Sequence, residues 1–386
     1  MKIGYYTFAN IRIAETFISD LIHGLEKKTD LVWYSGQKSI SEQIANKQIA
    51  AAFSPYEAPL PNWLFKIGQI KGNNGYHWRM KLRLLLAKKK LDNLRQLPDV
   101  AYVEFLTTAI MTREFFEEKN IPYIVHVHGY DITSELNDPA YRKEIKKVFL
   151  SVKYIIAASY FIKRLLVLEG CPAEKIEVIR LGVDVDSISP LSWVERKKNR
   201  PSIVFLGRLT EKKNPIALLY AFDIVKKQIP EATLTIIGQG YMQKEIESRI
   251  ETLSLKDSVV MLGALPREKS FSIMNKHWIY AQHSVTSVHG DKEGYAISPA
   301  EAAAHELPVV STIHNGIPEH VINGKTGFLV PEFDYEKMAE RMIELLRNPG
   351  LCEQMGKAGR ENIKVLNDPR KRIDKIYSLL KKVSNK

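Results

Sequence analysis

Two basic residues follow a short apolar run near the middle of the chain. The run IVFLG (203–207) leads directly to Arg208, and Lys213 follows five positions later. An arginine binds phosphate oxygens in a bidentate manner, whereas a lysine supplies a compact point charge. Together they could bind a multiply charged anion such as a diphosphate. Most Lys and Arg residues are simply solvated at the surface, so the pair alone is a weak signal.

Two glutamates form a second group, because Glu293 and Glu301 are separated by seven residues in GDKEGYAISPAEAAAHELPVVS (290–311). Ser298 and Pro299 fit a helix start in which Ser298 is the N-cap and Glu301 completes a capping box, which would make Glu301 structural. The same helix start, behind a glycine-containing loop, could instead attract phosphate through its free amides. In that loop, Glu293 is placed to accept hydrogen bonds from sugar hydroxyls.

The elements that must position these residues alternate along the whole chain. Short β-branched or aromatic runs alternate with amphipathic stretches, which is typical of βα units and parallel sheets. The expected helices include 15–27, 76–96 and 139–149, with helical segments from about 335 to 383. The expected strands are 2–8, 30–35, 100–105, 123–128, 154–159, 176–180, 202–207, 232–238, 258–263, 278–284, 307–312 and 327–330.

A polar, proline-bounded stretch at 182–201 interrupts this alternation. We therefore predict an α/β protein with two doubly wound, Rossmann-like domains that face each other across an interdomain cleft, where ligands bind at the carboxyl ends of the strands. The predicted domains are 1–185 and 201–367, with a linker at 186–200. The C-terminal helix at about 368–386 is a candidate to pack back on the first domain.

Composition limits the classes of function. The 386 residues are 45% hydrophobic and 26% charged, which indicates a folded globular protein. The net charge of +12 suits an anionic partner, yet the sequence has no recognition-helix, aromatic-platform or zinc signature of a nucleic-acid binder.

Cys171 and Cys352 are too few for a disulfide framework. Gly238-Gln239-Gly240 lacks the third glycine of a dinucleotide fingerprint. We expect a cytoplasmic protein.

The motifs together resemble a known family. GRLTEKK, DKEGYAISPAEA, LPVVST and HNGIPEHVINGKTGFLVP occur in order across most of 202–331, and this combination is similar to the group 1, or family 4, retaining glycosyltransferases with the GT-B fold. HVHGYD at 126–131 resembles the family's cleft loop. AETFI at 14–18 resembles the branch that builds exopolysaccharides of the colanic acid and amylovoran type.

The resemblance implies a role for each matching residue. Arg208 and Lys213 would bind the diphosphate of a nucleotide sugar as it leaves, and Glu301 would hold the ribose hydroxyls. Glu293 would hold hydroxyls of the donor sugar, while His128 would face that sugar from the other domain. The implied catalytic residues are thus Glu293, Arg208, Lys213 and His128, and the implied substrate-binding residues are Glu301, Gly294, Tyr295, Gly207 and Asp131, with Gly294 and Tyr295 acting through their amides.

The resemblance also implies the reaction. The chain would move a sugar, with retention of anomeric configuration, from a nucleotide-diphosphate sugar to a saccharide acceptor, carried on a polyprenyl diphosphate, in bacterial surface polysaccharide biosynthesis. No cofactor or metal would be required, and Asp184-Val185-Asp186, which mimics a metal-binding DxD motif, is interpreted as linker. The alternatives are an inactive nucleotide-sugar-binding or regulatory homologue and a nucleic-acid-binding basic protein.

Two positions depart from the family pattern. Glu306 stands where the family usually has a glycine, so we expect the preceding helix to end without its usual left-handed glycine cap. The first loop reads FANIRIAETF, without the paired glycines of many members.

A basic window lies in the predicted first domain. Nine Lys or Arg residues between positions 66 and 95 are interleaved with apolar side chains, and Asp92 is the only acidic residue there. Such a window could dock the protein on an anionic membrane surface, at the inner face of the plasma membrane, through 62–95. An ordinary solvated helix whose leucines face the sheet fits the pattern equally well.

Overall fold

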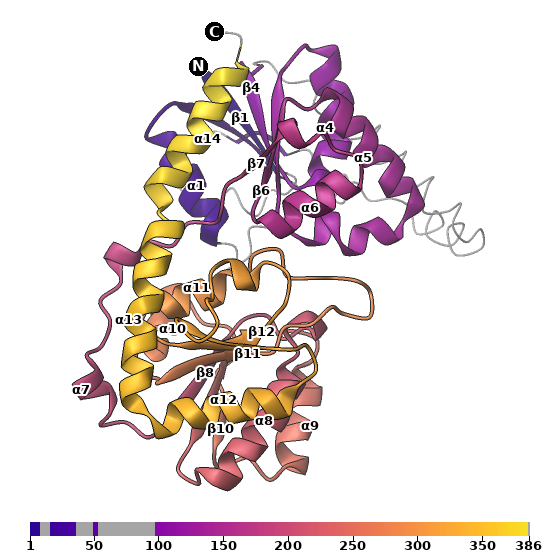
Figure 1. Cartoon of the computed structure of the whole chain (residues 1–386). Coiled ribbons are helices and arrows are strands. Elements are labelled where there is room, and N and C mark those ends of the chain that lie inside the picture. The colour runs from indigo at the N-terminus through magenta and orange to yellow at the C-terminus, as the bar shows by residue number, and fades with distance from the viewer. Residues whose placement is uncertain (8–15, 36–48, 53–96, 385–386) are drawn as a thin grey trace. The chain divides into compact units, whose positions relative to one another are not determined.

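A computed structural model describes residues 1–7, 16–35, 49–52 and 97–384 of the chain. These residues form two compact units (Figure 1). Unit 1 comprises Met1–Ala158, Ile162–Ile179 and Ile373–Lys386, and unit 2 comprises Ser159–Phe161 and Arg180–Arg372. The predicted helix at 76–96, the first-loop pattern at 8–15 and the basic window at 62–95 lie outside the described residues.

Unit 1 is built on a parallel sheet of seven strands in the order β3-β2-β1-β4-β5-β6-β7. The strands are β1 (Lys2–Thr7), β2 (Asp30–Ser35), β3 (Ile49–Ala52), β4 (Val100–Glu104), β5 (Tyr123–Val127), β6 (Tyr154–Ala157) and β7 (Ile176–Val178). The helices between them are α1 (Thr16–Glu26), α4 (Leu106–Glu118), α5 (Pro139–Ser151) and α6 (Tyr160–Leu168).

Unit 2 repeats this architecture with six parallel strands in the order β10-β9-β8-β11-β12-β13. The strands are β8 (Ser202–Leu206), β9 (Thr233–Ile237), β10 (Val259–Met261), β11 (Ile279–Gln282), β12 (Val309–Thr312) and β13 (Gly327–Val330). The helices are α7 (Trp193–Arg196), α8 (Pro215–Gln228), α9 (Gln243–Thr252), α10 (Arg267–Met274), α11 (Ile297–Ala304), α12 (Tyr335–Arg347), α13 (Pro349–Leu366) and α14 (Pro369–Val383), which continues into unit 1.

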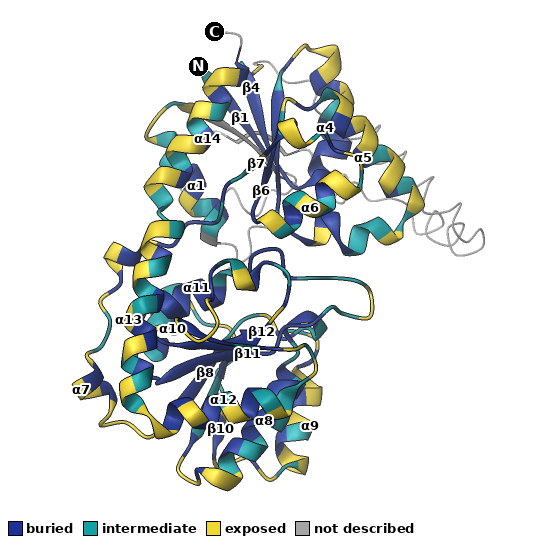
Figure 2. Cartoon of the chain, viewed as in Figure 1, coloured by how far each residue is buried: buried dark blue, intermediate teal, exposed yellow. Residues whose placement is uncertain are grey.

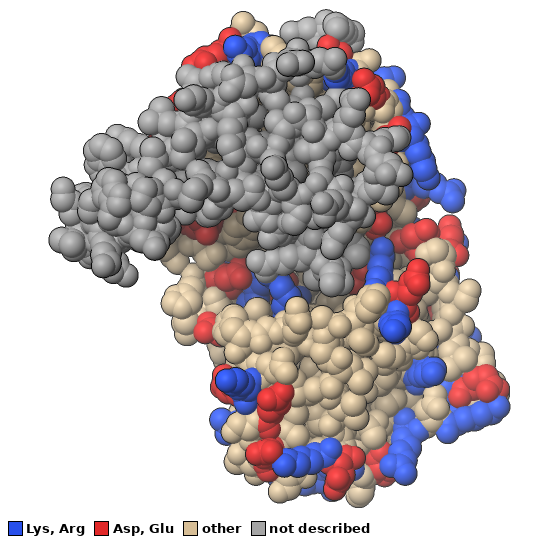
Figure 3. Space-filling model, turned by 180° about the vertical axis from the view of Figure 1, so that it is seen from behind, with Lys and Arg blue, Asp and Glu red and all other residues tan. Residues whose placement is uncertain are grey.

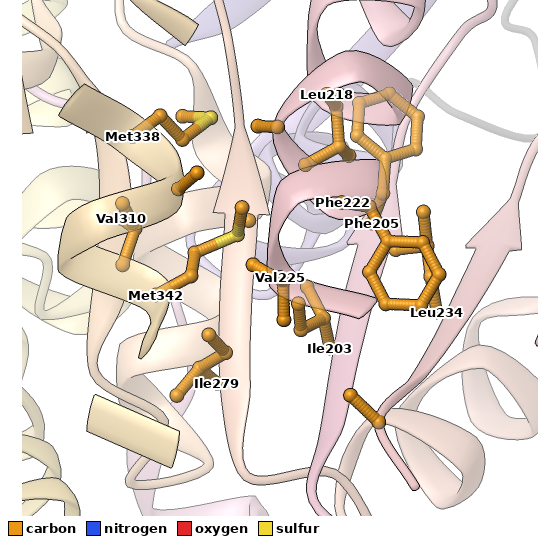
Figure 4. Close-up of a cluster of buried hydrophobic side chains, with 14 of the residues drawn as sticks. Ile203, Phe205, Leu218, Phe222, Val225, Leu234, Ile279, Val310, Met338 and Met342 are labelled. Carbon is orange, nitrogen blue, oxygen red and sulfur yellow. The ribbon is translucent and has the colours of Figure 1, made fainter. Parts of the chain in front are cut away.

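The central strands β4 and β5 of unit 1 and β11 and β12 of unit 2 are buried along their whole length because helices cover both sides of a parallel sheet, and Figure 2 shows the central strands dark blue in each unit. In unit 2, Phe205 of β8 packs with Phe222 of α8 in one apolar cluster (Figure 4). The same cluster includes Met338 and Met342 of α12. Fully buried side chains of this size each contribute ~1.5–3 kcal/mol, so the central strand β8 is held firmly at its position.

The residues predicted as a linker, 186–200, fall within unit 2. Trp193 and Arg196 of this stretch are buried, and the Arg196 guanidinium donates hydrogen bonds to the carbonyls of Glu306 and His305 at 3.1 and 2.9 Å. From α14, Ile376 and Leu380 are part of the unit 1 core.

The described surface carries charges of both signs. On the face drawn in Figure 3, Lys and Arg side chains alternate with Asp and Glu over unit 2, with wide uncharged areas between them. None of the helices in the described part of the chain is both long and apolar enough to cross a membrane.

Candidate functional site

The loop that follows β8 carries both predicted cations. It runs from Gly207 into a 3₁₀ turn at Glu211–Lys213, and α8 then begins behind Asn214, whose side chain caps it by accepting from the Ala217 amide at 3.2 Å. The Arg208 side chain is exposed, whereas Lys213 is buried. The two cations therefore differ in environment, although one loop carries both.

Two glycines hold this loop in place. A Cβ atom on Gly238 would lie 1.8 Å from the Gly207 carbonyl oxygen, and one on Gly240 would lie 2.2 Å from that of Leu209. The Leu209 amide also donates to the Gln239 carbonyl at 3.0 Å. The incomplete fingerprint Gly238-Gln239-Gly240 thus serves close packing of two neighbouring loops at the carboxyl edge of the sheet.

Lys213 and Glu293 form a buried ion pair. The Lys213 Nζ atom lies 2.9 Å from Glu293 Oε1, and it also donates to Gln282 Oε1 at 3.4 Å. Burial lowers the pKa of Lys213. Burial alone would raise the pKa of Glu293, but the charges of Lys213 and Lys212 outweigh it and lower this pKa to about 2. The structure therefore brings two predicted site residues, far apart in sequence, into direct contact.

Backbone contacts fix the turn that carries Glu293. The Glu293 amide donates to Nε2 of His314 at 3.2 Å, and Nδ1 of His314 lies 2.7 Å from Glu332 Oε1. Sequence reasoning gave no role to His314 or Glu332. They follow β12 and β13, which are the next strands beyond β11 in the sheet, and the shared edge of these strands is the signal that could have found them.

Gly294 and Tyr295 continue this turn. The Gly294 carbonyl accepts a hydrogen bond from the Ser159 hydroxyl at 2.7 Å. The Tyr295 ring is buried, and its hydroxyl donates to Asn367 Oδ1 at 2.8 Å. The Tyr295 side chain is thus occupied within unit 2, so only its backbone amide remains for a ligand.

Glu301 lies on α11, but the capping-box interpretation is wrong. Helix α11 begins at Ile297 behind Ala296, and no side chain caps it. Ser298 lies inside the helix, where its hydroxyl bonds to Gln282 Oε1 at 3.3 Å. Glu301 is buried, and its carboxylate lies 3.5 Å from the Arg267 guanidinium. A capping role therefore does not account for Glu301.

Sequence reasoning missed a polar network that contacts both Lys213 and the start of α11. The Tyr280 hydroxyl is 2.8 Å from Gln282 Oε1 and 3.0 Å from the Ser298 hydroxyl. Gln282 Nε2 in turn donates to the Ser284 hydroxyl at 2.6 Å. Since Gln282 also contacts Lys213, the network links the loop after β8 to the start of α11.

In unit 1, His128 directly follows β5 and belongs to a buried network. Its Nε2 atom lies 2.5 Å from Glu104 Oε2, and the other oxygen of Glu104 accepts from the Tyr5 hydroxyl. The rings of Phe17 and Phe105 lie 5.0 and 4.9 Å from the His128 ring. Sequence reasoning missed Glu104, which is fully buried at the carboxyl end of β4.

Asp131 is fully buried, and it binds backbone rather than open space. Its carboxylate accepts from the amides of Leu106, His128 and Gly129 at 3.1, 3.2 and 2.9 Å. Burial raises the pKa of Asp131, although His128 and these amides oppose the shift. In this arrangement Asp131 holds the His128 loop to the start of α4.

Glu104, His126 and His128 offer the one cluster of potential metal ligands among the described residues, with ligand atoms within 4.8 Å of one another. Hydrogen bonds already occupy these groups, because Glu104 bonds to Tyr5 and His128, while His126 Nδ1 lies 2.6 Å from the Tyr102 hydroxyl.

The predicted site residues thus fall into two groups. Unit 2 holds Gly207, Arg208, Lys213, Glu293, Gly294, Tyr295 and Glu301, which follow β8 and β11 and lie at the carboxyl edge of one sheet. Unit 1 holds His128 and Asp131. Their roles toward a ligand stay predictions.

Two family models match the chain. The model described as Glycosyltransferase Family 4 matches residues 14–187, and the model described as Glycosyl transferases group 1 matches residues 191–362. The first match covers most of unit 1, and the second covers most of unit 2.

Similar proteins include WcaL of Escherichia coli (strain K12), which is named as a candidate colanic acid biosynthesis glycosyltransferase and is 35% identical over 56% of this chain and 53% of its own. The amylovoran biosynthesis glycosyltransferase AmsK of Erwinia amylovora is 32% identical over the same shares of both chains. The chain thus spans about half the length of these relatives.

Among solved structures, Anabaena Alr3699/HepE in complex with UDP and glucose has a TM-score of 0.75 at 17% identity, covering 99% of this chain and 100% of that chain. At this identity the likeness concerns the fold alone, which is GT-B. With a family 4 domain followed by a group 1 domain, the chain belongs to the group 1 and family 4 glycosyltransferases.

Proposed function

We propose that the protein transfers a sugar from a nucleotide-diphosphate sugar to a saccharide acceptor. The observation that carries this proposal is the buried Lys213–Glu293 pair beside the exposed Arg208, at the carboxyl edge of the unit 2 sheet. A fixed cation next to a carboxylate suits a donor that joins an anionic diphosphate to a sugar rich in hydroxyls.

In the proposed reaction the bond between the anomeric carbon and the diphosphate oxygen breaks, and a bond to an acceptor hydroxyl oxygen forms. The acceptor proton leaves with the diphosphate product. Negative charge grows on the diphosphate as the bond breaks, so Arg208 and Lys213 stabilise the transition state more than the ground state. Glu293 and the Gly294 and Tyr295 amides would hold the sugar and the adjoining phosphate.

Two finer features belong to the proposal. Retention of anomeric configuration rests on the family resemblance of the motifs. Independence from metal rests on the two cations of the loop after β8, which supply the charge that a metal ion would otherwise bring to the leaving diphosphate.

We further propose that the acceptor is lipid-linked and belongs to exopolysaccharide assembly. This proposal rests on the relatives named for colanic acid and amylovoran biosynthesis and on the basic window at 62–95, which lies outside the described residues. Changing Lys88, Lys89 and Lys90 to Gln should reduce salt-sensitive co-sedimentation with anionic vesicles. Binding that is unchanged by these substitutions would favour the alternative interpretation of the window as an ordinary solvated helix.

The test is a panel of nucleotide sugars, based on UDP and GDP, incubated with EDTA and with simple sugar acceptors. We expect one donor to support hydrolysis or transfer, and proton NMR of the product to show the anomeric configuration of the donor. Arg208→Ala should lower the activity by about 100- to 1000-fold, whereas Lys256→Ala, which changes an exposed cation paired with Glu251, should not. Selective binding of one nucleoside diphosphate without turnover of any donor would instead support the inactive homologue.

A further inference from the structure

We propose that Glu332 and His314 form a positioning relay that fixes the turn carrying Glu293 by holding its backbone amide. The consequence for catalysis rests on the function proposed above. The relay itself is a matter of hydrogen bonding within unit 2, so it can be tested whether or not that function holds.

Three segments from three neighbouring strands meet in the relay. Glu293 comes after β11, His314 after β12 and Glu332 after β13, which lie side by side in the sheet. The Glu293 amide is 3.2 Å from His314 Nε2, and His314 Nδ1 is 2.7 Å from Glu332 Oε1. The His314 side chain is fully buried. A buried group bonded at both ends has one orientation, which it can impose on the turn.

The hydrogen-bond directions follow from the groups at the two ends. An ionised carboxylate only accepts, so His314 Nδ1 must carry the proton that points at Glu332. A backbone amide only donates, so Nε2 must present its lone pair to Glu293. The Thr286 amide donates to the other oxygen of Glu332 at 3.0 Å, which anchors the carboxylate. Burial also lowers the pKa of His314, which favours the neutral imidazole that this pattern requires.

The opposite tautomer would break the pattern at both ends. It would set an N–H group of His314 against the Glu293 N–H and leave a lone pair facing the Glu332 carboxylate. Glu332 therefore selects the tautomer that binds the turn.

The same segment supports the turn at its next residue. A Cβ atom on Gly316 would lie 2.1 Å from the Gly294 carbonyl oxygen, so this backbone approaches the turn closely. Fixed in this way, the turn places the Glu293 carboxylate 2.9 Å from Lys213. His314 and Glu332 thus act through Glu293 and are positioning residues.

The first experiment reads the tautomer directly by NMR of the full chain labelled with ¹⁵N-histidine. We expect His314 of the unmodified protein to carry its proton on Nδ1. Glu332→Ala should increase the Nε2–H form of His314, while His277, whose Nδ1 atom faces the Ile273 carbonyl and whose Nε2 faces Thr235, serves as the unchanged control. His314 that keeps a proton on Nδ1 in Glu332→Ala, or carries it on Nε2 in the unmodified protein, would overturn the relay.

The second experiment measures the active donor and its nucleoside diphosphate separately. His314→Ala should lower kcat by about 10- to 100-fold, as expected for a displaced reacting group. Nucleoside diphosphate affinity should fall by a smaller factor than kcat, since that ligand lacks the sugar and meets the turn only through its phosphate. His314→Gln, which offers a donor and an acceptor on one amide, should recover most of the loss. Equal kcat in the unmodified and Ala proteins, or an equal loss in the Gln and Ala proteins, would contradict positioning.

Failure of the proposed function has a different signature. If the unmodified protein turns over no donor, the proposed function is contradicted and the kinetic experiment cannot be carried out. The tautomer of His314, measured with and without Glu332, still decides whether the relay exists.

Discussion

Arg208 and Lys213 share one loop, yet only Lys213 has a charged neighbour that is itself buried. Removing Lys213 leaves the Glu293 carboxylate in the interior without the cation 2.9 Å away, which is a costly arrangement. Arg208 is exposed, so its removal leaves no such defect. The two residues should therefore separate catalysis from stability.

The first prediction concerns this difference. Arg208→Ala should lower kcat by about 100- to 1000-fold without changing Tm, because it removes a charge-assisted contact to the leaving diphosphate. Lys213→Ala should lower both kcat and Tm. The double variant Lys213→Ala, Glu293→Gln should regain Tm but not activity, as differential scanning calorimetry and donor turnover would show. A large drop in Tm for Arg208→Ala would contradict the assignment.

The second prediction concerns Glu301, for which capping is excluded as a role. If its carboxylate holds ribose hydroxyls, Glu301→Gln should weaken nucleoside diphosphate binding by about 10-fold, the usual worth of a hydrogen bond to a charged group. Titration calorimetry gives the affinity, and Glu344→Gln, an exposed change on α12, is the control. A lowered Tm with unchanged affinity would show that Glu301 only supports the fold.

Sequence reasoning named candidate site residues that lie within recognisable motifs, such as Arg208 and Glu293. It missed Gln282, His314 and Glu332. Each of these contacts a partner in the loop that follows another strand, so it enters the site only through the order of strands in the sheet, which one sequence does not state.

At the scale of single elements, the end of α11 shows how the chain tolerates a residue that its position disfavours. Glu306 has a φ of 59°, in the left-handed region that favours glycine. The expectation that the helix ends without a glycine cap holds, but the left-handed turn is kept by Glu306. Its carbonyl oxygen would lie 2.0 Å from a Cβ atom on Gly356, so packing against α13 maintains the turn.

The third prediction follows from this strain. Glu306→Gly should raise the free energy of unfolding by about 1 kcal/mol, because a side chain in this conformation carries a cost of that order. The matched control, Glu340→Gly in the exposed middle of α12, should lower it by about 1 kcal/mol. Urea unfolding measures both, and a destabilised Glu306→Gly would show that the glutamate side chain has a supporting role.

Among the elements themselves, the described strands were predicted within a few residues, apart from β3. Its sequence, Ile49-Ala50-Ala51-Ala52, is short and rich in alanine, which strands rarely contain. The start of α11 was placed two residues late, at Pro299 behind Ser298 as N-cap, because a serine followed by proline matches an N-cap pattern whatever the tertiary structure requires.

At the scale of the whole molecule, unit 2 buries several histidines in their neutral form. Burial lowers the pKa of His277, His283 and His305 to about 4 and that of His320 to about 3. In the unfolded chain a histidine has a pKa near 6.5. Between these values the unfolded chain binds more protons than the folded protein, so stability falls as pH falls.

The fourth prediction is therefore a loss of stability between about pH 6.5 and pH 4, with a plateau above pH 7. Each such histidine contributes on the order of 1–3 kcal/mol to the loss. Below about pH 4.5 the unfolded chain also binds a proton at Glu293, whereas the folded protein does not until its Glu293 pKa of about 2. This difference adds to the loss of stability. Urea unfolding at several pH values measures the slope, and His277→Asn should make it shallower. Constant stability from pH 7 to pH 5 would contradict the neutral, buried assignment.

Helix α14 has a consequence for the order in which the protein is made. Its residues Ile376 and Leu380 complete the apolar core that β1, α1 and β4 begin, and all of unit 2 lies between them in the chain. The chain holds every residue of unit 2 by position 372, whereas unit 1, although translated earlier, still lacks part of its core at that point. The unit translated first must therefore be the last to close, and a released chain that stops at residue 372 would hold a complete second unit and an unsealed first one.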